Sequence, residues 1–144
     1  MADIRHMIQT GGPREKVYSL VSTIKGLSEW WAADVSEGAD GTVELGFFNK
    51  ATVYRLRRVA TEGTQLCEWI CESGKEWEGT RLTFLLEDAS GGGTVVRFAH
   101  ARWRAETDYF TSCNTTWGEL MFRLKTAAEG KAPGPLFLAA SLAY

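Results

Sequence analysis

The stretch GGGTVVRFAHARW, residues 91–103, decides how this chain folds, together with the longer stretch that follows it. Its three consecutive glycines supply the positive φ angles that a tight reversal needs. The alternation after them places Val96, Phe98 and His100 on one face of a strand and Arg97 on the other. This pattern predicts a sheet with one buried face.

The second stretch, FTSCNTTWGELMFRLKTAAEG, covers residues 110–130 and has helical periodicity. Large apolar side chains recur at positions i, i+3, i+4 and i+7, namely Trp117, Leu120, Met121 and Leu124. Such a stripe predicts a long amphipathic helix, near residues 107–129, that buries one face against a larger surface. We expect the sheet to be that surface and a pocket to lie between sheet and helix.

The rest of the chain predicts two short helices and further strands. Apolar residues at helical spacing follow Pro13, a residue favoured in the first turn of a helix, so we expect two short helices within residues 13–31. Alternating segments separated by glycine or small polar residues predict strands at residues 3–10, 42–48, 51–60, 65–72 and 80–88. No connection between these later strands is long enough for a crossover helix, so the sheet is expected to be antiparallel.

Length and composition are typical of a single domain, at residues 1–130, with an irregular tail at residues 131–144. The elements predicted above make it an α+β domain with an antiparallel sheet of about six strands. The 144 residues are 44% hydrophobic and 24% charged, with a net charge of −2, so we expect no nucleic-acid partner. No apolar run has the length of about 18 residues typical of a membrane span. The first ten residues lack the apolar core of a secretory signal, so the cytoplasm is the expected compartment.

Four segments together resemble the START/Bet v 1-like (SRPBCC) superfamily, whose fold is called a helix grip. They are PREKVYSLVST leading to LSEWW, then EWEGTRLTFLLED, then GGGTVVRFAH, and finally TTWGELMFRLK. More narrowly, the chain is similar to small stand-alone relatives of the carboxy-terminal domain of the Hsp90 ATPase activator. The resemblance covers roughly residues 3–130 and implies a hydrophobic cavity and, in many members, no established catalytic activity.

The side chains that alternation places on the inner face of the sheet, together with the apolar stripe of the long helix, predict a mainly apolar pocket. Its expected ligand-binding residues are Trp31, Tyr54, Trp69, Phe84, Phe98, His100, Trp117 and Met121. We expect burial to lower the pKa of His100 and keep it neutral, so that it orients a ligand. The alternative is a core histidine whose nitrogens bond to neighbouring groups. Trp77 and Trp103 are expected nearer strand ends, with a structural role.

Catalytic and metal-binding patterns are sparse. His6 also falls on the inward face of its strand, but two histidines and three cysteines show none of the usual zinc spacings. We therefore expect no metal and no cofactor. Cys67 and Cys71 lie on one strand, too far apart for a disulfide, so reduced thiols are expected.

Three functions compete. The first is a binding domain for a small hydrophobic or aromatic molecule, which requires only an apolar cavity and a few polar groups. The second is an enzyme resembling polyketide cyclases or hydrolases that uses His100, although no partner residue for it is evident. The third is a chaperone-associated module, implied by the resemblance to the Hsp90 activator; because the chain begins at the first strand, without that activator's amino-terminal domain, we do not expect an Hsp90 role. Either a monomer or a homodimer is compatible with the sequence.

Overall fold

The computed structural model describes residues 2–138, which form one curved sheet with three helices. In chain order the main elements are β1 (Ala2–Thr10), α1 (Arg14–Ser22), α2 (Ile24–Trp30), β2 (Asp34–Glu37), β3 (Val43–Phe47), β4 (Thr52–Glu62), β5 (Leu66–Ser73), β6 (Arg81–Asp88), β7 (Thr94–Trp103) and α3 (Asp108–Ala128). A short 3-10 turn, Ala39–Gly41, lies between β2 and β3.

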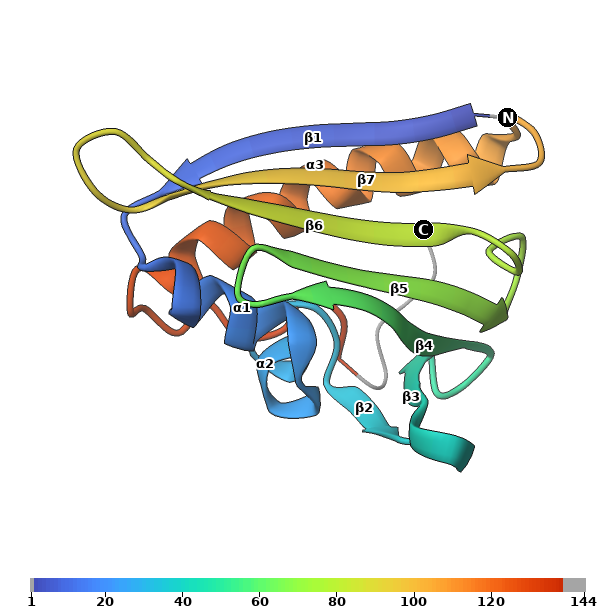
Figure 1. The fold of residues 1–144 in the computed structure, drawn as a ribbon. Helices are drawn as coiled ribbons and strands as arrows, with labels where there is room; N and C mark the ends of the chain where they lie inside the picture. Colours follow the sequence, from blue (N-terminus) through green and yellow to red (C-terminus); the bar gives the residue numbers. More distant parts are fainter. Residues whose placement is uncertain (1, 139–144) are drawn as a thin grey trace.

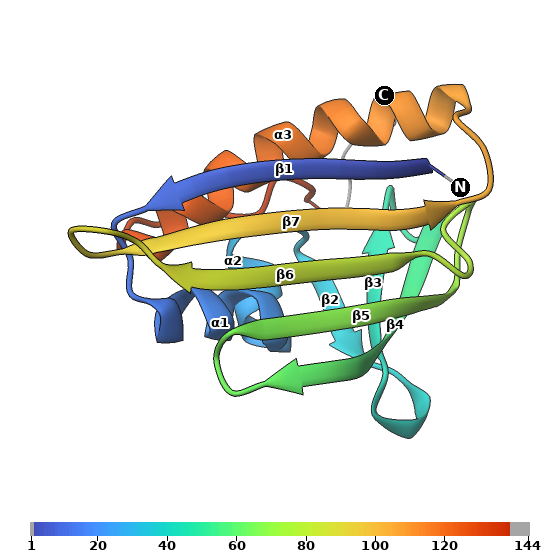
Figure 2. The same ribbon diagram turned by 45° about the horizontal axis from the view of Figure 1, so that its top comes forward.

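The sheet is antiparallel throughout, with the strand order β1-β7-β6-β5-β4-β3-β2. Figures 1 and 2 show it curving so that all three helices lie on its concave side, with α3 running along the β1–β7 side. This arrangement confirms the predicted α+β helix-grip fold. The first and last strands are neighbours, with Ile4 opposite His100 and His6 opposite Phe98.

Strand β2 is an element that the sequence did not predict. It has four residues, Asp34–Glu37, and none of its side chains is fully buried. A short polar segment shows no hydrophobic alternation, so only its backbone pairing with β3, from Asp34–Gly46 to Glu37–Val43, makes it a strand. The sheet therefore has seven strands instead of about six.

The two short helices lie within residues 13–31, as expected, and they meet at Thr23. The Thr23 hydroxyl caps α2 by accepting a hydrogen bond from the backbone N–H of Gly26, at 2.9 Å. A Cβ at Gly26 would lie 2.2 Å from the carbonyl oxygen of Ser19, so only glycine permits this close packing of α2 on α1. The long helix α3 is capped in the same way by Thr107, which accepts from the N–H of Phe110.

Alternation correctly predicted which side chains point inward. Leu82, Phe84 and Leu86 of β6 are buried, and so are Tyr54 and Leu56 of β4. The outward side chains of β4 and β5 form ion pairs, Glu72 with Arg55 and Arg57. Within residues 2–138, no helix combines the length and the apolar character needed to cross a membrane.

A bulge near the end of β7 breaks the alternation. Arg102 has a positive φ of 69°, and its backbone N–H bonds to the carboxylate of Asp3. The register between β1 and β7 shifts at this point. As a result Trp103, which simple alternation would leave on the outer face, turns inward and is buried.

The segment after α3 folds back onto α2. Residues 131–138 contain no helix, but the backbone of Phe137 forms an isolated parallel bridge with Ala32. Arg123 of α3 donates two hydrogen bonds to this segment, to the carbonyl oxygens of Pro133 and Gly134. The predicted irregular tail extends to residue 144, and its last six residues lie outside the part that the structure describes.

Candidate ligand pocket

A small cavity lies on the concave side of the sheet, between the first half of α3 and strands β3 and β4. Its volume is about 30 Å³, which is room for roughly two water molecules. Every lining side chain is uncharged and most are aromatic: Trp31, Phe47, Phe48, Thr52, Tyr54, Trp77, Tyr109, Cys113, Thr116, Trp117, Leu120 and Phe137.

Three of the residues predicted for the pocket, Trp31, Tyr54 and Trp117, line this cavity. The others are buried as well, but they lie outside the lining: Trp69, Phe84, Phe98, His100 and Met121. The space between sheet and helices thus has two parts. We call the part around Trp69, Phe84 and Met121 the packed end and the part around Tyr54, Trp77 and Phe137 the cavity end.

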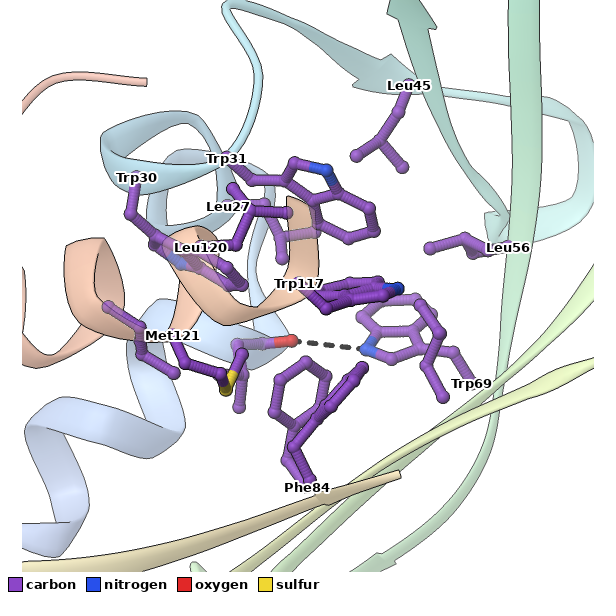
Figure 3. Close-up of a cluster of buried hydrophobic side chains, with 14 of the residues drawn as sticks. Leu27, Trp30, Trp31, Leu45, Leu56, Trp69, Phe84, Trp117, Leu120 and Met121 are labelled. Carbon is purple, nitrogen blue, oxygen red and sulfur yellow. Dashed lines mark hydrogen bonds between the residues drawn. The ribbon is translucent and has the colours of Figure 1, made fainter. Parts of the chain in front are cut away.

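At the packed end, α1 and α2 close directly on the sheet (Figure 3). The indole N–H of Trp69 donates to the carbonyl oxygen of Val21 at 3.1 Å, and that of Trp30 donates to Leu20 at 2.9 Å. Phe84 packs edge-on against Trp30, with ring centroids 6.4 Å apart. Because both indoles have partners and these side chains are buried, this end reads as core.

His100 is fully buried at the centre of a hydrogen-bond chain. The indole N–H of Trp117 lies 3.1 Å from its Nδ1, so Nδ1 must accept, and Nε2 must therefore carry the proton. Nε2 then donates to the hydroxyl of Thr80 at 2.9 Å, and that hydroxyl donates to the carbonyl oxygen of Trp77 at 2.6 Å. A ligand would reach either nitrogen only by replacing Trp117 or Thr80.

Burial also sets the protonation state of His100. Desolvation of the imidazolium lowers the pKa of His100 to about 3, because no carboxylate faces the ring to compensate. The imidazole is neutral at physiological pH, as the sequence predicted. With both nitrogens bonded to protein groups, it has the geometry of a core histidine.

Trp77 is the residue of the cavity end that sequence reasoning assigned to a strand end. Its ring stacks on Tyr54 with centroids 3.7 Å apart and planes within 5° of parallel. The turn between β5 and β6 delivers it, with Gly74 at φ 142° and Gly79 at φ 85° on either side. The sequence signal for this position is a tryptophan in a short connection with a glycine on each side. The two glycines permit a turn that folds the tryptophan back over the sheet.

The indole N–H of Trp77 is buried and has no hydrogen-bond partner within the described residues. The nearby Cys113 thiol is a weak acceptor, and the pair does not reach hydrogen-bond geometry. Burial raises the pKa of Cys113 to about 11, with Trp77 and Tyr109 opposing this shift. The thiol is therefore protonated at neutral pH and is no nucleophile.

Two tyrosines bring polar groups to the cavity wall. The hydroxyls of Tyr54 and Tyr109 hydrogen-bond to each other, joining β4 to the first turn of α3. The ammonium group of Lys75 lies 4.5 Å from the centre of the Tyr109 ring. The hydroxyl of Thr107, just before α3, donates to Glu76 at 2.6 Å. These contacts tie the turn that holds Trp77 to the start of α3.

His6 does not join His100. Its Nε2 instead bonds to the side-chain oxygen of Asn114 on α3 at 3.0 Å. Within residues 2–138, no three histidine, cysteine or acidic side chains are grouped closely enough to hold a metal ion. The wall of the cavity end is uncharged and mostly aromatic, and among the residues that line it no nucleophile is paired with a base.

Comparison with known proteins finds relatives among solved structures. The solution structure of the Aha1 dimer from Colwellia psychrerythraea is 30% identical in sequence, with a TM-score of 0.79 over 90% of this chain and 97% of that one. Protein BH1534 from Bacillus halodurans is 20% identical, with a TM-score of 0.71 over 90% of this chain and 98% of that one. Protein SSP2350 from Staphylococcus saprophyticus is 18% identical, with a TM-score of 0.72 over 96% and 99%. No protein-family profile and no curated protein sequence matches the chain.

Proposed function

This chain belongs to the Aha1-like family of the START/Bet v 1-like superfamily, and from that premise we propose that it binds a small, uncharged aromatic molecule at the cavity end. We place this function in the cytoplasm, in a monomer or a homodimer. The premise supplies the architecture only, because one fold hosts many functions. The ligand class follows from the side chains around the cavity.

The observation that carries the proposal is the unpartnered indole N–H of Trp77 in an aromatic wall. A buried donor without a partner costs about 1–3 kcal/mol, so a ligand oxygen that accepts from it recovers that free energy. The flat faces of Trp31, Tyr54 and Trp117 favour a planar ring, and no charged group lines the cavity to neutralise an ion. An aromatic molecule with a hydroxyl or carbonyl group fits these requirements.

The enzyme alternative that uses His100 has less support. Its two nitrogens already bond to Trp117 and Thr80, and its low pKa makes it a poor base at neutral pH. A chaperone-associated role has a specific basis in the 30% identity to Aha1, and it remains the second candidate. Isothermal titration of the protein with purified Hsp90 tests that candidate separately from ligand binding.

Fluorescence titration with naphthol and naphthalene tests ligand binding. Both are planar and uncharged, but only naphthol carries an oxygen that accepts from Trp77. We expect naphthol to bind and quench tryptophan emission, and Trp77→Phe to weaken naphthol binding about fivefold to tenfold relative to naphthalene. Leu85→Ser, on the outer face of β6, serves as the control and should change neither affinity. Failure of the wild-type protein to bind either compound would refute the proposal.

A further inference from the structure

We infer that the segment after α3 plugs this pocket from within, so that the ring of Phe137 holds the place that a ligand ring takes. This inference rests on the proposed function and adds how the site is controlled. The free protein is then closed by its own C-terminal segment, and binding exchanges one aromatic ring for another. The ligand part that enters first is accordingly about the size of a phenyl ring.

The first argument is the position of the Phe137 side chain. It lines the cavity and is only 8% exposed. Its ring meets Phe47 and Phe48 edge to face, with centroid distances of 5.1 and 5.9 Å. These are ordinary geometries for an aromatic guest in an aromatic host. The ring thus occupies space continuous with the cavity that Tyr54 and Trp77 border.

The second argument is that residues 131–138, which carry the plug, form no helix and no strand of the sheet. Between residues 131 and 138 only Phe137 is buried. The backbone of the segment pairs over a short length with the end of α2 and the residues after it: Leu136 donates to Trp30 at 3.2 Å, Phe137 donates to Trp31 at 3.0 Å, and Ala33 donates to Phe137 at 2.8 Å. Beyond this pairing, the segment accepts the two hydrogen bonds from Arg123. Most of the other residues that line the cavity belong to helix α3 or to strands β3 and β4. Phe137 can therefore leave without unfolding a helix or a strand.

The third argument concerns size. The cavity of about 30 Å³ is too small for an aromatic ring while Phe137 is seated. Removal of that ring joins its volume to the cavity next to Trp31 and Tyr54. Opening has a cost in affinity: if the plug is seated in about nine of ten molecules, the apparent affinity for a ligand falls about tenfold.

The turn between β3 and β4 forms the other side of the plug's seat. Three successive non-glycine residues, Phe48, Asn49 and Lys50, have φ angles of 54°, 55° and 67°. Such left-handed conformations persist only where surrounding contacts hold them. Because Phe48 packs on Phe137, we expect departure of the plug to change this turn as well.

Naphthol binding to three versions of the protein tests the inference. Phe137→Ala removes the plug and should strengthen naphthol binding about tenfold. Leu138→Ala changes an exposed neighbour in the same segment and should leave the affinity unchanged. Equal naphthol affinity in the wild type and Phe137→Ala would overturn the plug and leave the proposed function standing. Absence of binding in all versions would overturn both.

Amide hydrogen exchange in the wild-type protein gives a second readout that needs no variant. The N–H groups of Phe137 and Ala33 are, with that of Leu136, the backbone donors that pair the segment to its seat. Saturating naphthol should speed their exchange at least severalfold, while the amides of β6 and β7 exchange no faster. Unchanged protection of Phe137 and Ala33 in the naphthol-bound protein would show that the ligand sits elsewhere.

Discussion

The packed end and the cavity end lie under the same sheet and helix, yet one is solid and the other is not. At the packed end, Trp69, Phe84 and Met121 come from the middle of regular elements, and the indole of Trp69 has a partner. At the cavity end, Trp77 and Phe137 come from a turn and an irregular segment, and the indole of Trp77 has no partner among residues 2–138. The period of a helix or strand fixes which of its side chains face the core. In a connection no such period exists, so the path of the backbone decides which side chains come into contact.

The difference indicates how the two ends contribute to the stability of the domain. Close packing at one end stabilises the domain, since each buried apolar group there contributes to the free energy of folding. Incomplete packing at the other end leaves a buried donor and a small void, both of which reduce stability. Three measurements on unfolding test this division, beginning with the largest expected effect.

Phenylalanine truncation should be more costly at the packed end. Phe84→Ala removes a fully buried ring held by Trp30 and Phe98, and we expect it to lower the free energy of unfolding by about 3–5 kcal/mol. Phe137→Ala at the cavity end should cost only about 1–2 kcal/mol, because the segment is free to relax. Urea denaturation of both variants measures the difference. Equal losses would mean that the two ends are packed alike.

Stability should fall in mild acid because of His100, whose ring contacts Trp77 and bonds to Trp117. Its pKa is about 3 when folded and about 6.5 when unfolded, so protons bind preferentially to the unfolded chain in this interval. The stabilisation is complete above pH 6.5 and is lost as the pH falls, by about 1.4 kcal/mol per pH unit. Between pH 7 and pH 5 we expect a loss of about 2 kcal/mol relative to His100→Gln.

The glutamine variant is the matched reference for that measurement. Its amide oxygen can accept from Trp117 and its amide nitrogen can donate to Thr80, but it does not titrate. His6 is present in both proteins, so its contribution cancels in the comparison. Parallel pH profiles of the wild type and His100→Gln would show that His100 is not buried as a neutral group.

The smallest expected effect compares two tryptophans whose indoles differ in their partners. Trp117→Phe deletes the donor to Nδ1 of His100 and leaves that nitrogen buried without a hydrogen bond. Trp77→Phe deletes a donor that has no partner. Both changes replace an indole by a phenyl ring, so the difference isolates the hydrogen bond, and Trp117→Phe should be the more destabilising by about 1 kcal/mol. Thermal unfolding of the two variants at neutral pH decides it, and the opposite ranking would mean that Trp77 has a partner in solution.

The amino-acid sequence was sufficient for those features that depend on periodicity. Alternation in β6 placed Phe84 inward, the helical stripe oriented Trp117 toward the sheet, and glycines marked the reversal before β7. Strand β2 was missed because its four residues include only one apolar side chain, Val35, and so carry no alternation; only pairing with β3 defines it. Of the residues expected around a pocket, Trp31, Tyr54 and Trp117 line the cavity, whereas Trp69 and Phe84 lie in the core; their role in binding stays a prediction.

By itself, then, the sequence determined the long strands and the long amphipathic helix, the inward face of each long strand and the burial of His100. Each of these follows from repeats of two or about 3.6 residues, which are local properties of strand and helix geometry. The tertiary structure alone decided that Trp77 stacks on Tyr54, that a bulge turns Trp103 inward and that Phe137 lines the cavity. Those positions depend on the paths of connections, where no period relates a residue to a face, so contacts between distant segments place the side chains.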